Sequence, residues 1–180
     1  MNKSVLKFYL FGDSICFGQL VGSHQTWATY LAKELEEYAA LKLPVIVQNA
    51  GVNGNTTRQA LERMYYDVLS HRPDYIMIQF GMNDCNFWDT DFGYPRVSEK
   101  AFMANIEEMV VKSTSAGCKH CFINTNHPSI KEKTVSKKFC NYDKSNRRYN
   151  HLIRKATKRL KSLKLPVSLI DVEKKWISYL

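Results

Sequence analysis

Apolar segments along the chain follow two different periodicities. Short apolar runs bounded by turn residues are typical of buried strands, and longer segments with apolar residues at helical spacing predict amphipathic helices. Strands are expected at about Val5–Phe11, Val45–Gln48, Tyr75–Phe80, His120–Asn124 and Val167–Ile170. Helices are expected at about Thr26–Tyr38, from Asn55 or Thr56 to Leu69, at Ser98–Ser115 and at Ser145–Leu163. Because strand and helix alternate, the strands should be parallel and covered by helices on both faces.

The predicted fold class is therefore α/β, a three-layer α/β/α sandwich of flavodoxin-like type with a parallel sheet of about five strands. The length of 180 residues is sufficient for one core, and no repeat, low-complexity tract or linker divides the chain, so we expect one domain over residues 1–180. A long polar connection, Asn126 to Asp143, leaves the fourth strand. Loops of that length are often functional, and this one should lie over the carboxyl end of the sheet.

Polar motifs follow each of the first three strands. They are Phe11-Gly12-Asp13-Ser14, Gly51-Val52-Asn53-Gly54-Asn55-Thr56 and Gly81-Met82-Asn83-Asp84. Open α/β sheets bind their ligands at the carboxyl ends of the strands. The three motifs are therefore expected to meet at one edge of the sheet, with a serine hydroxyl among them.

Together these motifs resemble the first three blocks of the SGNH (GDSL-type) esterase and acylhydrolase family, and the resemblance covers essentially the whole chain. It implies that Ser14 is the nucleophile and that the N–H groups of Ser14 and Gly54 and the side-chain amide of Asn83 hold the oxyanion. The implied activity is hydrolysis of a small-molecule ester, such as a lipid or an acetylated sugar, through an acyl-enzyme on Ser14. No metal or organic cofactor is implied.

Each motif also has a purely structural interpretation. Asp13 and Ser14 are common helix-capping residues, Gly54 suits a turn with positive φ, and Asn83 suits an Asx turn. Asp84 is expected to hold its loop rather than to act in catalysis. The order of the three motifs, each at a strand end, favours the functional interpretation over the structural one.

The general base is the missing part of the pattern. The family's last block, Asp-x-x-His, is absent from residues 1–180, and Asp171 is interpreted as a strand-terminal residue. We therefore expect the chain to be incomplete at its carboxyl end, with a helix still continuing there. Of the five histidines, His127 is the one expected near Ser14, as a base or a substrate contact, or else as a loop residue packed against Pro128. His24 is a weaker candidate.

The formal charge of +9 is concentrated in residues 131–164, which hold 13 of the 26 Lys and Arg residues and only Glu132 and Asp143 among the acids. The basic helix in this segment fits either an anionic partner or a solvated face whose apolar side, including Leu152, Ile153, Leu160 and Leu163, packs on the sheet. No nucleic-acid motif accompanies it. No apolar run is long enough to span a membrane.

The five cysteines show no framework spacing, so we expect reduced thiols and a cytoplasmic location. Cys118 and Cys121 resemble half of a zinc site, but no second pair of ligands follows, and buried thiols are favoured there. Cys16 and Cys85 flank the proposed site and are expected to be accessible to solvent.

Two other functions remain open. One is a catalytically silent binding protein that keeps the fold and the pocket but lacks the base. The other, a flavodoxin-like nucleotide-binding protein, is disfavoured because no glycine-rich phosphate loop follows any strand. Association into a homo-oligomer, driven by apolar surface at an incomplete carboxyl end, also remains open.

Overall fold

Five parallel strands form one sheet in the order β2-β1-β3-β4-β5. The computed structural model describes residues 5–38, 43–129 and 141–179. The strands are β1 (Leu6–Gly12), β2 (Val45–Gly51), β3 (Tyr75–Gln79), β4 (His120–Asn124) and β5 (Val167–Ile170). This is the flavodoxin-like order, in which the direction of winding reverses between β1 and β3. The predicted fold class is confirmed, and the reversal places the ends of β1 and β3 beside one another.

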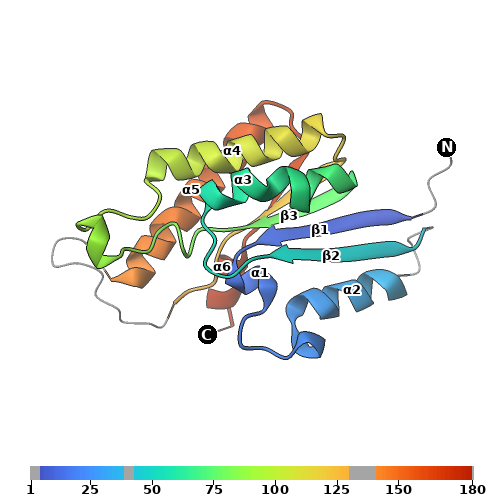
Figure 1. The fold of residues 1–180 in the computed structure, drawn as a ribbon, viewed down its shortest axis with the longest axis horizontal. Helices are drawn as coiled ribbons and strands as arrows, with labels where there is room; N and C mark the ends of the chain where they lie inside the picture. Colours follow the sequence, from blue (N-terminus) through green and yellow to red (C-terminus); the bar gives the residue numbers. More distant parts are fainter. Residues whose placement is uncertain (1–4, 39–42, 130–140, 180) are drawn as a thin grey trace.

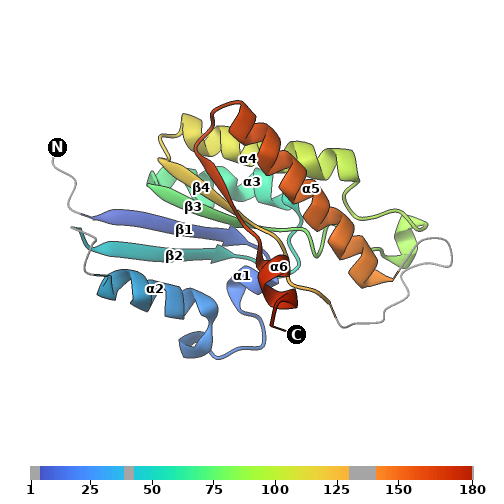
Figure 2. The ribbon, with the colours of Figure 1, turned by 180° about the vertical axis from the view of Figure 1, so that it is seen from behind.

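The helices are α1 (Ser14–Phe17), α2 (Trp27–Glu37), α3 (Thr57–Asp67), α4 (Glu99–Ser115), α5 (Tyr142–Ser162) and α6 (Val172–Ile177), with short 3₁₀ turns η1 (Ser23–Gln25), η2 (Leu69–His71) and η3 (Asp89–Asp91). Helices α3, α4 and α5 lie on one side of the sheet, and α2 lies on the other (Figures 1 and 2). The carboxyl ends of the strands point toward α1 and α6, so the loops of the proposed site gather there.

Two hydrophobic clusters lie on opposite faces of the sheet. Successive strand residues point to opposite faces, so Ile76 and Ile78 belong to the larger cluster under α3, α4 and α5. Met77 between them belongs to the smaller cluster that packs against α2. The described helices cover the two faces unequally, and both Ile residues are fully buried.

The observed elements differ from the predicted ones mainly at their ends. Helix α5 begins at Tyr142 rather than Ser145, because the Asn141 side chain accepts the Lys144 N–H at 3.0 Å and caps the helix. The single turn of α1, directly after β1, was not predicted from the sequence. A helix continuing at the carboxyl end was expected, whereas α6 ends at Ile177 with Ser178 as its C-cap.

The basic helix α5 is only partly the solvated face that the sequence favours. Ile153 and Leu160 are buried on the sheet side, as expected, whereas Leu163 is 63% exposed. Arg154 was expected on the solvated face, but its guanidinium forms ion pairs with Asp171 and Glu173. Part of the basic segment, residues 130–140, lies outside the described residues. No helix in the described ranges has both the length and the hydropathy needed to cross a membrane.

Candidate active site

Ser14 is the first residue of α1 and follows β1 through a tight turn. Asp13 is the N-cap, and its side chain accepts the Ile15 N–H at 3.0 Å. A helix leaves its first N–H groups without an acceptor inside the helix, so the Ser14 N–H is available to a ligand. Residue 12 must be glycine for steric reasons. A Cβ at this position would lie 2.4 Å from the Cys16 Cβ and 2.7 Å from the Gln79 carbonyl oxygen.

Gly54 lies in the loop between β2 and α3. Its φ of +76° is in the left-handed region that favours glycine. The Arg96 guanidinium donates to the Gly54 carbonyl oxygen at 3.2 Å, and this bond holds the peptide between Gly54 and Asn55. Gly51, the other glycine of the motif, has a packing role, because a Cβ there would lie 2.4 Å from the Phe17 backbone nitrogen.

Asn83 joins the three motifs. It follows β3, and its Nδ2 donates to the Asn55 carbonyl oxygen at 3.1 Å, next to Gly54. A second, longer contact of 3.4 Å runs from Nδ2 to the Asp13 Oδ2, next to Ser14. The amide nitrogen carries two hydrogens, and the one in the longer contact is only weakly engaged. The side chain is thus tied to the loops of both other motifs.

Ser14 and Asn83 line one cavity of about 380 Å³. The other lining residues are Ile15, Met82, Asn86, His127, Ser129 and Tyr142. Gly54 is not among them. A larger cavity of about 480 Å³ lies between α2 and β2, but Ser14 does not line it and its walls carry no charged side chain. Of the candidate site residues, Ser14, Asn83 and His127 therefore line the smaller cavity.

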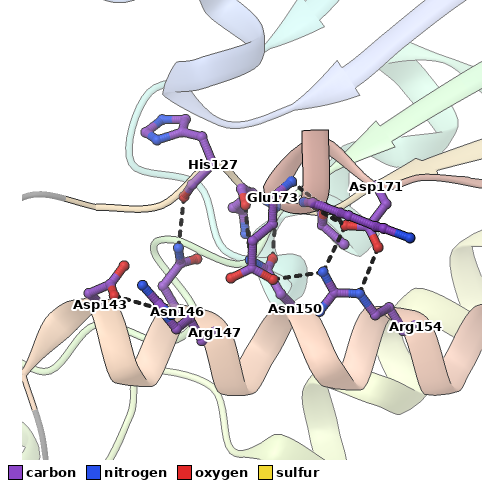
Figure 3. A network of polar contacts seen from close by, with 11 residues as sticks. His127, Asp143, Asn146, Arg147, Asn150, Arg154, Asp171 and Glu173 are labelled. Atoms are coloured by element: carbon purple, nitrogen blue, oxygen red, sulfur yellow. Dashed lines mark hydrogen bonds and ion pairs between the residues drawn. The ribbon is translucent and has the colours of Figure 1, made fainter. Parts of the chain in front are cut away.

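His127 reaches this cavity from the loop after β4. Its Nδ1 lies 2.8 Å from the Pro128 carbonyl oxygen, and its ring centroid lies 5.5 Å from that of Trp176 on α6. Figure 3 shows the ring pointing away from α5, while Asn146 on α5 donates to the His127 carbonyl oxygen at 2.9 Å. Within the described residues, no hydrogen bond joins His127 to Ser14. His24 lies in η1 and does not line the cavity.

Two carboxyl groups are buried beneath the site. The pKa of Asp13 is raised to about 7, chiefly by burial and also by the neighbouring charge of Asp84, whereas the hydrogen bond from the Ile15 N–H lowers it. Burial likewise raises the pKa of Asp84 to about 6. Asp84 holds its loop as expected, because its Oδ1 accepts the Thr57 N–H at 2.9 Å at the start of α3. Its Oδ2 is buried and has no hydrogen-bond partner among the described residues.

The contacts of Asp171 give it a structural role. It caps α6, and its carboxylate accepts two hydrogen bonds from Arg154 at 2.7 and 2.9 Å (Figure 3). These bonds lower the pKa of Asp171 to about 2. The same guanidinium reaches Glu173 at 2.7 Å. The network holds α6 against α5, in agreement with the interpretation of Asp171 as a strand-terminal residue.

The exposure of the two cysteines beside the site differs from the prediction. Cys16 and Cys85 were expected to be accessible to solvent, but their exposed fractions are 1% and 0%. Burial raises the pKa of the Cys16 thiol to about 12 and that of the Cys85 thiol still higher. Cys118 and Cys121 are buried, as the sequence favours. The four described cysteines therefore pack as small apolar residues.

Two residues of α5 that hold the loop of Asn83 were not found from the sequence. Tyr142 at the start of α5 donates its hydroxyl to the Met82 carbonyl oxygen at 2.9 Å, and Ser145 donates to the Cys85 carbonyl oxygen at 2.8 Å. These bonds fix the loop that carries Asn83. A tyrosine and a serine in a polar stretch give no signal of this role, because it depends on how α5 crosses the ends of the strands.

Comparison with known proteins assigns the chain to one family. The profile of the GDSL-like lipase/acylhydrolase family matches residues 10–178. An arylesterase from Vibrio mimicus is 27% identical over 104 residues, which are 58% of this chain and 46% of that protein. The uncharacterized lipoprotein YqeF from Bacillus subtilis is 38% identical over 73 residues, 41% of this chain and 29% of that protein. The chain thus matches less than half the length of these two curated relatives.

Two solved structures have the same fold over nearly all of this chain. A lipase/acylhydrolase from Enterococcus faecalis has a TM-score of 0.72 at 26% identity, covering 97% of this chain and 80% of that chain. An acetylxylan esterase from Geobacillus stearothermophilus has a TM-score of 0.70 at 19% identity, covering 97% and 79%. The second likeness concerns the fold alone. With the family profile matched from the end of β1 to beyond α6, the chain belongs to the GDSL-like lipase/acylhydrolase family.

Proposed function

We propose that the protein is a serine esterase that hydrolyses a carboxylic ester through an acyl-enzyme on Ser14. The observation that carries the proposal is that Ser14 and Asn83, from loops after β1 and β3, line one cavity and that the Asn83 amide is tied to the loop of Gly54. Family membership supports ester hydrolysis in general. A nucleophile with convergent N–H donors is the arrangement that acyl transfer requires.

In the proposed mechanism the Ser14 Oγ attacks the ester carbonyl carbon. The negative charge that develops on the carbonyl oxygen is stabilised by the N–H groups of Ser14 and Gly54 and by the Asn83 Nδ2. The general base takes the Ser14 hydroxyl proton and passes it to the alcohol as the C–O bond of the ester breaks. The same base then takes a proton from water, which attacks the acyl carbon, and returns it to the Ser14 Oγ as the acid is released. The raised pKa of Asp13, about 7, favours stabilisation of the oxyanion, because a protonated carboxyl competes less for the Asn83 amide than a carboxylate does.

His127 is the base that the described residues offer. A hydrogen on Nδ1, donated to the Pro128 carbonyl oxygen, leaves Nε2 unprotonated and able to take the Ser14 proton. A movement of the ring toward Ser14 is required, because no hydrogen bond joins the two side chains in the described structure. Catalytic hydrogen bonds are often formed only when substrate is bound. His127 also remains a candidate substrate contact.

The cavity favours a small acyl ester as substrate. Its volume of about 380 Å³ accommodates a short acyl chain together with part of the alcohol, and Asn86, Ser129 and Tyr142 supply polar groups. Two of the similar proteins are named as an arylesterase and an acetylxylan esterase, and the acetyl group in the second name supports a short acyl ester here.

The test is hydrolysis of p-nitrophenyl acetate by the wild-type chain and by Ser14→Ala, with a serine-directed phosphonate as a second probe. We expect turnover and labelling in the wild type and neither in the variant. His127→Gln should retain phosphonate labelling at a lower rate if His127 is the base. Equal rates in the wild type and Ser14→Ala would contradict the proposal.

A silent binding protein is the second candidate. The observation that favours it is the missing contact between His127 and the Ser14 hydroxyl, since an unactivated serine is a weak nucleophile. Such a protein would bind an ester in equilibrium dialysis without hydrolysing it, and the phosphonate would leave Ser14 unlabelled. Hydrolysis that depends on Ser14 excludes this candidate.

A further inference from the structure

Arg63 lies where the segments of the proposed oxyanion donors meet. It is on α3, and its side chain is 17% exposed. Its Nε donates to the Asn55 Oδ1 at 2.6 Å, its Nη1 to the Ala50 carbonyl oxygen at 2.9 Å, and its Nη2 to the Gly12 carbonyl oxygen at 3.0 Å. One guanidinium therefore contacts the end of β1, the end of β2 and the loop that follows β2.

The shape of the guanidinium makes these contacts interdependent. Its N–H groups form a rigid planar fork, so three acceptors bound at once are fixed relative to one another. Ala50 is paired with Phe11 in the sheet register, directly before Gly12. The guanidinium lies over the Phe11 ring, 4.6 Å from its centroid, and Asp67 on the same helix holds it by an ion pair of 2.8 Å.

Two of the three acceptors, Gly12 and Asn55, lie within two residues of a proposed donor along the chain. Gly12 is followed by Asp13 and Ser14, and the Gly12 carbonyl oxygen also accepts the Val52 N–H at 3.0 Å. Asn55 directly follows Gly54, and its own carbonyl oxygen accepts the Asn83 Nδ2 at 3.1 Å. The hydrogen-bond acceptors of Arg63 in the described structure are not among the residues that line the cavity with Ser14 and Asn83, so it acts on that cavity indirectly, through the segments it holds.

We propose that Arg63 is a positioning residue that sets the spacing of the Ser14, Gly54 and Asn83 donors around the oxyanion. The proposal rests on the proposed esterase function. Transition-state stabilisation by such donors depends on their placement, and a displacement of about 1 Å costs on the order of 100-fold in rate. A lysine preserves the charge at this position but not the fork that binds three acceptors.

The first measurement is steady-state hydrolysis of p-nitrophenyl acetate by Arg63→Lys, with Arg58→Lys as the matched control. Arg58 is on the same helix and exposed. We expect kcat of Arg63→Lys to fall by about 10- to 100-fold with little change in KM, because an interaction of the transition state is lost. The control should match the wild type. Equal kinetics of Arg63→Lys and the wild type would overturn the proposal.

The second measurement follows the amide resonances of Ser14 and Gly54 and the side-chain amide of Asn83 by NMR. We expect these to shift in Arg63→Lys and in Asn55→Ala, which removes the Nε acceptor, and to stay unchanged in Arg58→Lys. Unchanged resonances in both variants would overturn the positioning role. If the wild type and Ser14→Ala hydrolyse the ester equally, the esterase function fails, and the resonances still decide whether Arg63 places these groups.

Discussion

At the scale of single residues, the site depends on side chains with two tasks. Asn83 is a proposed oxyanion donor and also ties the loop of Gly54 to the turn of Ser14 through its two contacts. Asp84 beside it holds α3 and places a carboxyl group in an environment without water. A variant of such a residue can change both activity and stability, so enzyme kinetics and unfolding are measured separately for it.

For Asn83→Ala we expect kcat for p-nitrophenyl acetate to fall by about 10²–10³-fold, because one oxyanion donor is lost. Steady-state kinetics measures this change, and KM should change little. Asn86→Ala is the matched control, because the same type of side chain is removed from the same cavity. An equal fall in both variants would show that the cavity shape, and not the Asn83 donor, controls the rate.

Asp84→Asn should change how stability depends on pH. The native state of the wild type keeps a proton on Asp84 up to its pKa of about 6, whereas the unfolded chain releases it near 3.8. The free energy of unfolding therefore falls as pH rises between about 4 and 6, by about 3 kcal/mol from this group. Asparagine keeps the Oδ1 acceptor but does not ionise.

Urea denaturation of wild type and Asp84→Asn at several pH values measures the difference. We expect the variant to gain stability relative to the wild type across this interval and the gain to level off above a pH of about 6. A difference that does not depend on pH would exclude Asp84 as a group with a raised pKa.

At the scale of elements, α5 holds the loops that carry the candidate site residues. Its first half donates to the loops that carry Asn83 and His127, and Arg154 in its second half binds α6. Glu173 on α6 is only 7% exposed at its side chain, so its charge needs this partner. Arg154 thus helps to hold α6, which carries Trp176 next to the His127 ring, together with the hydrogen bonds of Thr125 to Asp171 and Glu173.

Arg154→Met should destabilise the fold by about 3 kcal/mol, because a buried carboxylate loses its ion pair. Arg147→Met on the same helix is the control, since Arg147 is 55% exposed and its ion pair with Asp143 should contribute at most about 1 kcal/mol. Denaturant unfolding of both variants measures the difference. Equal losses would mean that the Arg154 network adds nothing beyond a surface ion pair.

At the scale of the whole molecule, the sheet has unequal covers on its two faces. Three long helices cover one face, and within the described residues α2 is the main cover of the other. Ile78 and Met77 are neighbours on β3 that point to opposite faces, and they are 0% and 8% exposed. They form a natural pair for testing how much each layer contributes.

Ile78→Ala should cost about 4 kcal/mol of unfolding free energy, and Met77→Ala about 2 kcal/mol, because the cavity left on the thinner side can collapse or fill with water more easily. Thermal and urea unfolding measure both values. A larger loss for Met77→Ala would show that the face of α2 is the better packed one.

Much of the candidate site could be proposed from the sequence because its parts are local. Gly12, Asp13 and Ser14 are adjacent, and a turn after a buried strand has few possible conformations. Gly54 and Asn83 follow strands that were each predicted to within a few residues, so the carboxyl edge of the sheet was expected to collect them. Local periodicity and turn chemistry are properties of short segments, and a sequence displays them directly.

The contacts between distant segments were decided only by the tertiary structure. Nothing in the sequence distinguishes Arg63 from Arg58, and only the order β2-β1-β3 brings the Gly12, Ala50 and Asn55 acceptors to one guanidinium. Cys16 and Cys85 were expected to be exposed, and their burial follows from how α1 and α5 pack. The sequence by itself determined the fold class and the positions of the motifs, because these depend on near neighbours. The partners that hold the motifs in place depend on strand order and helix crossing, which only the folded chain defines.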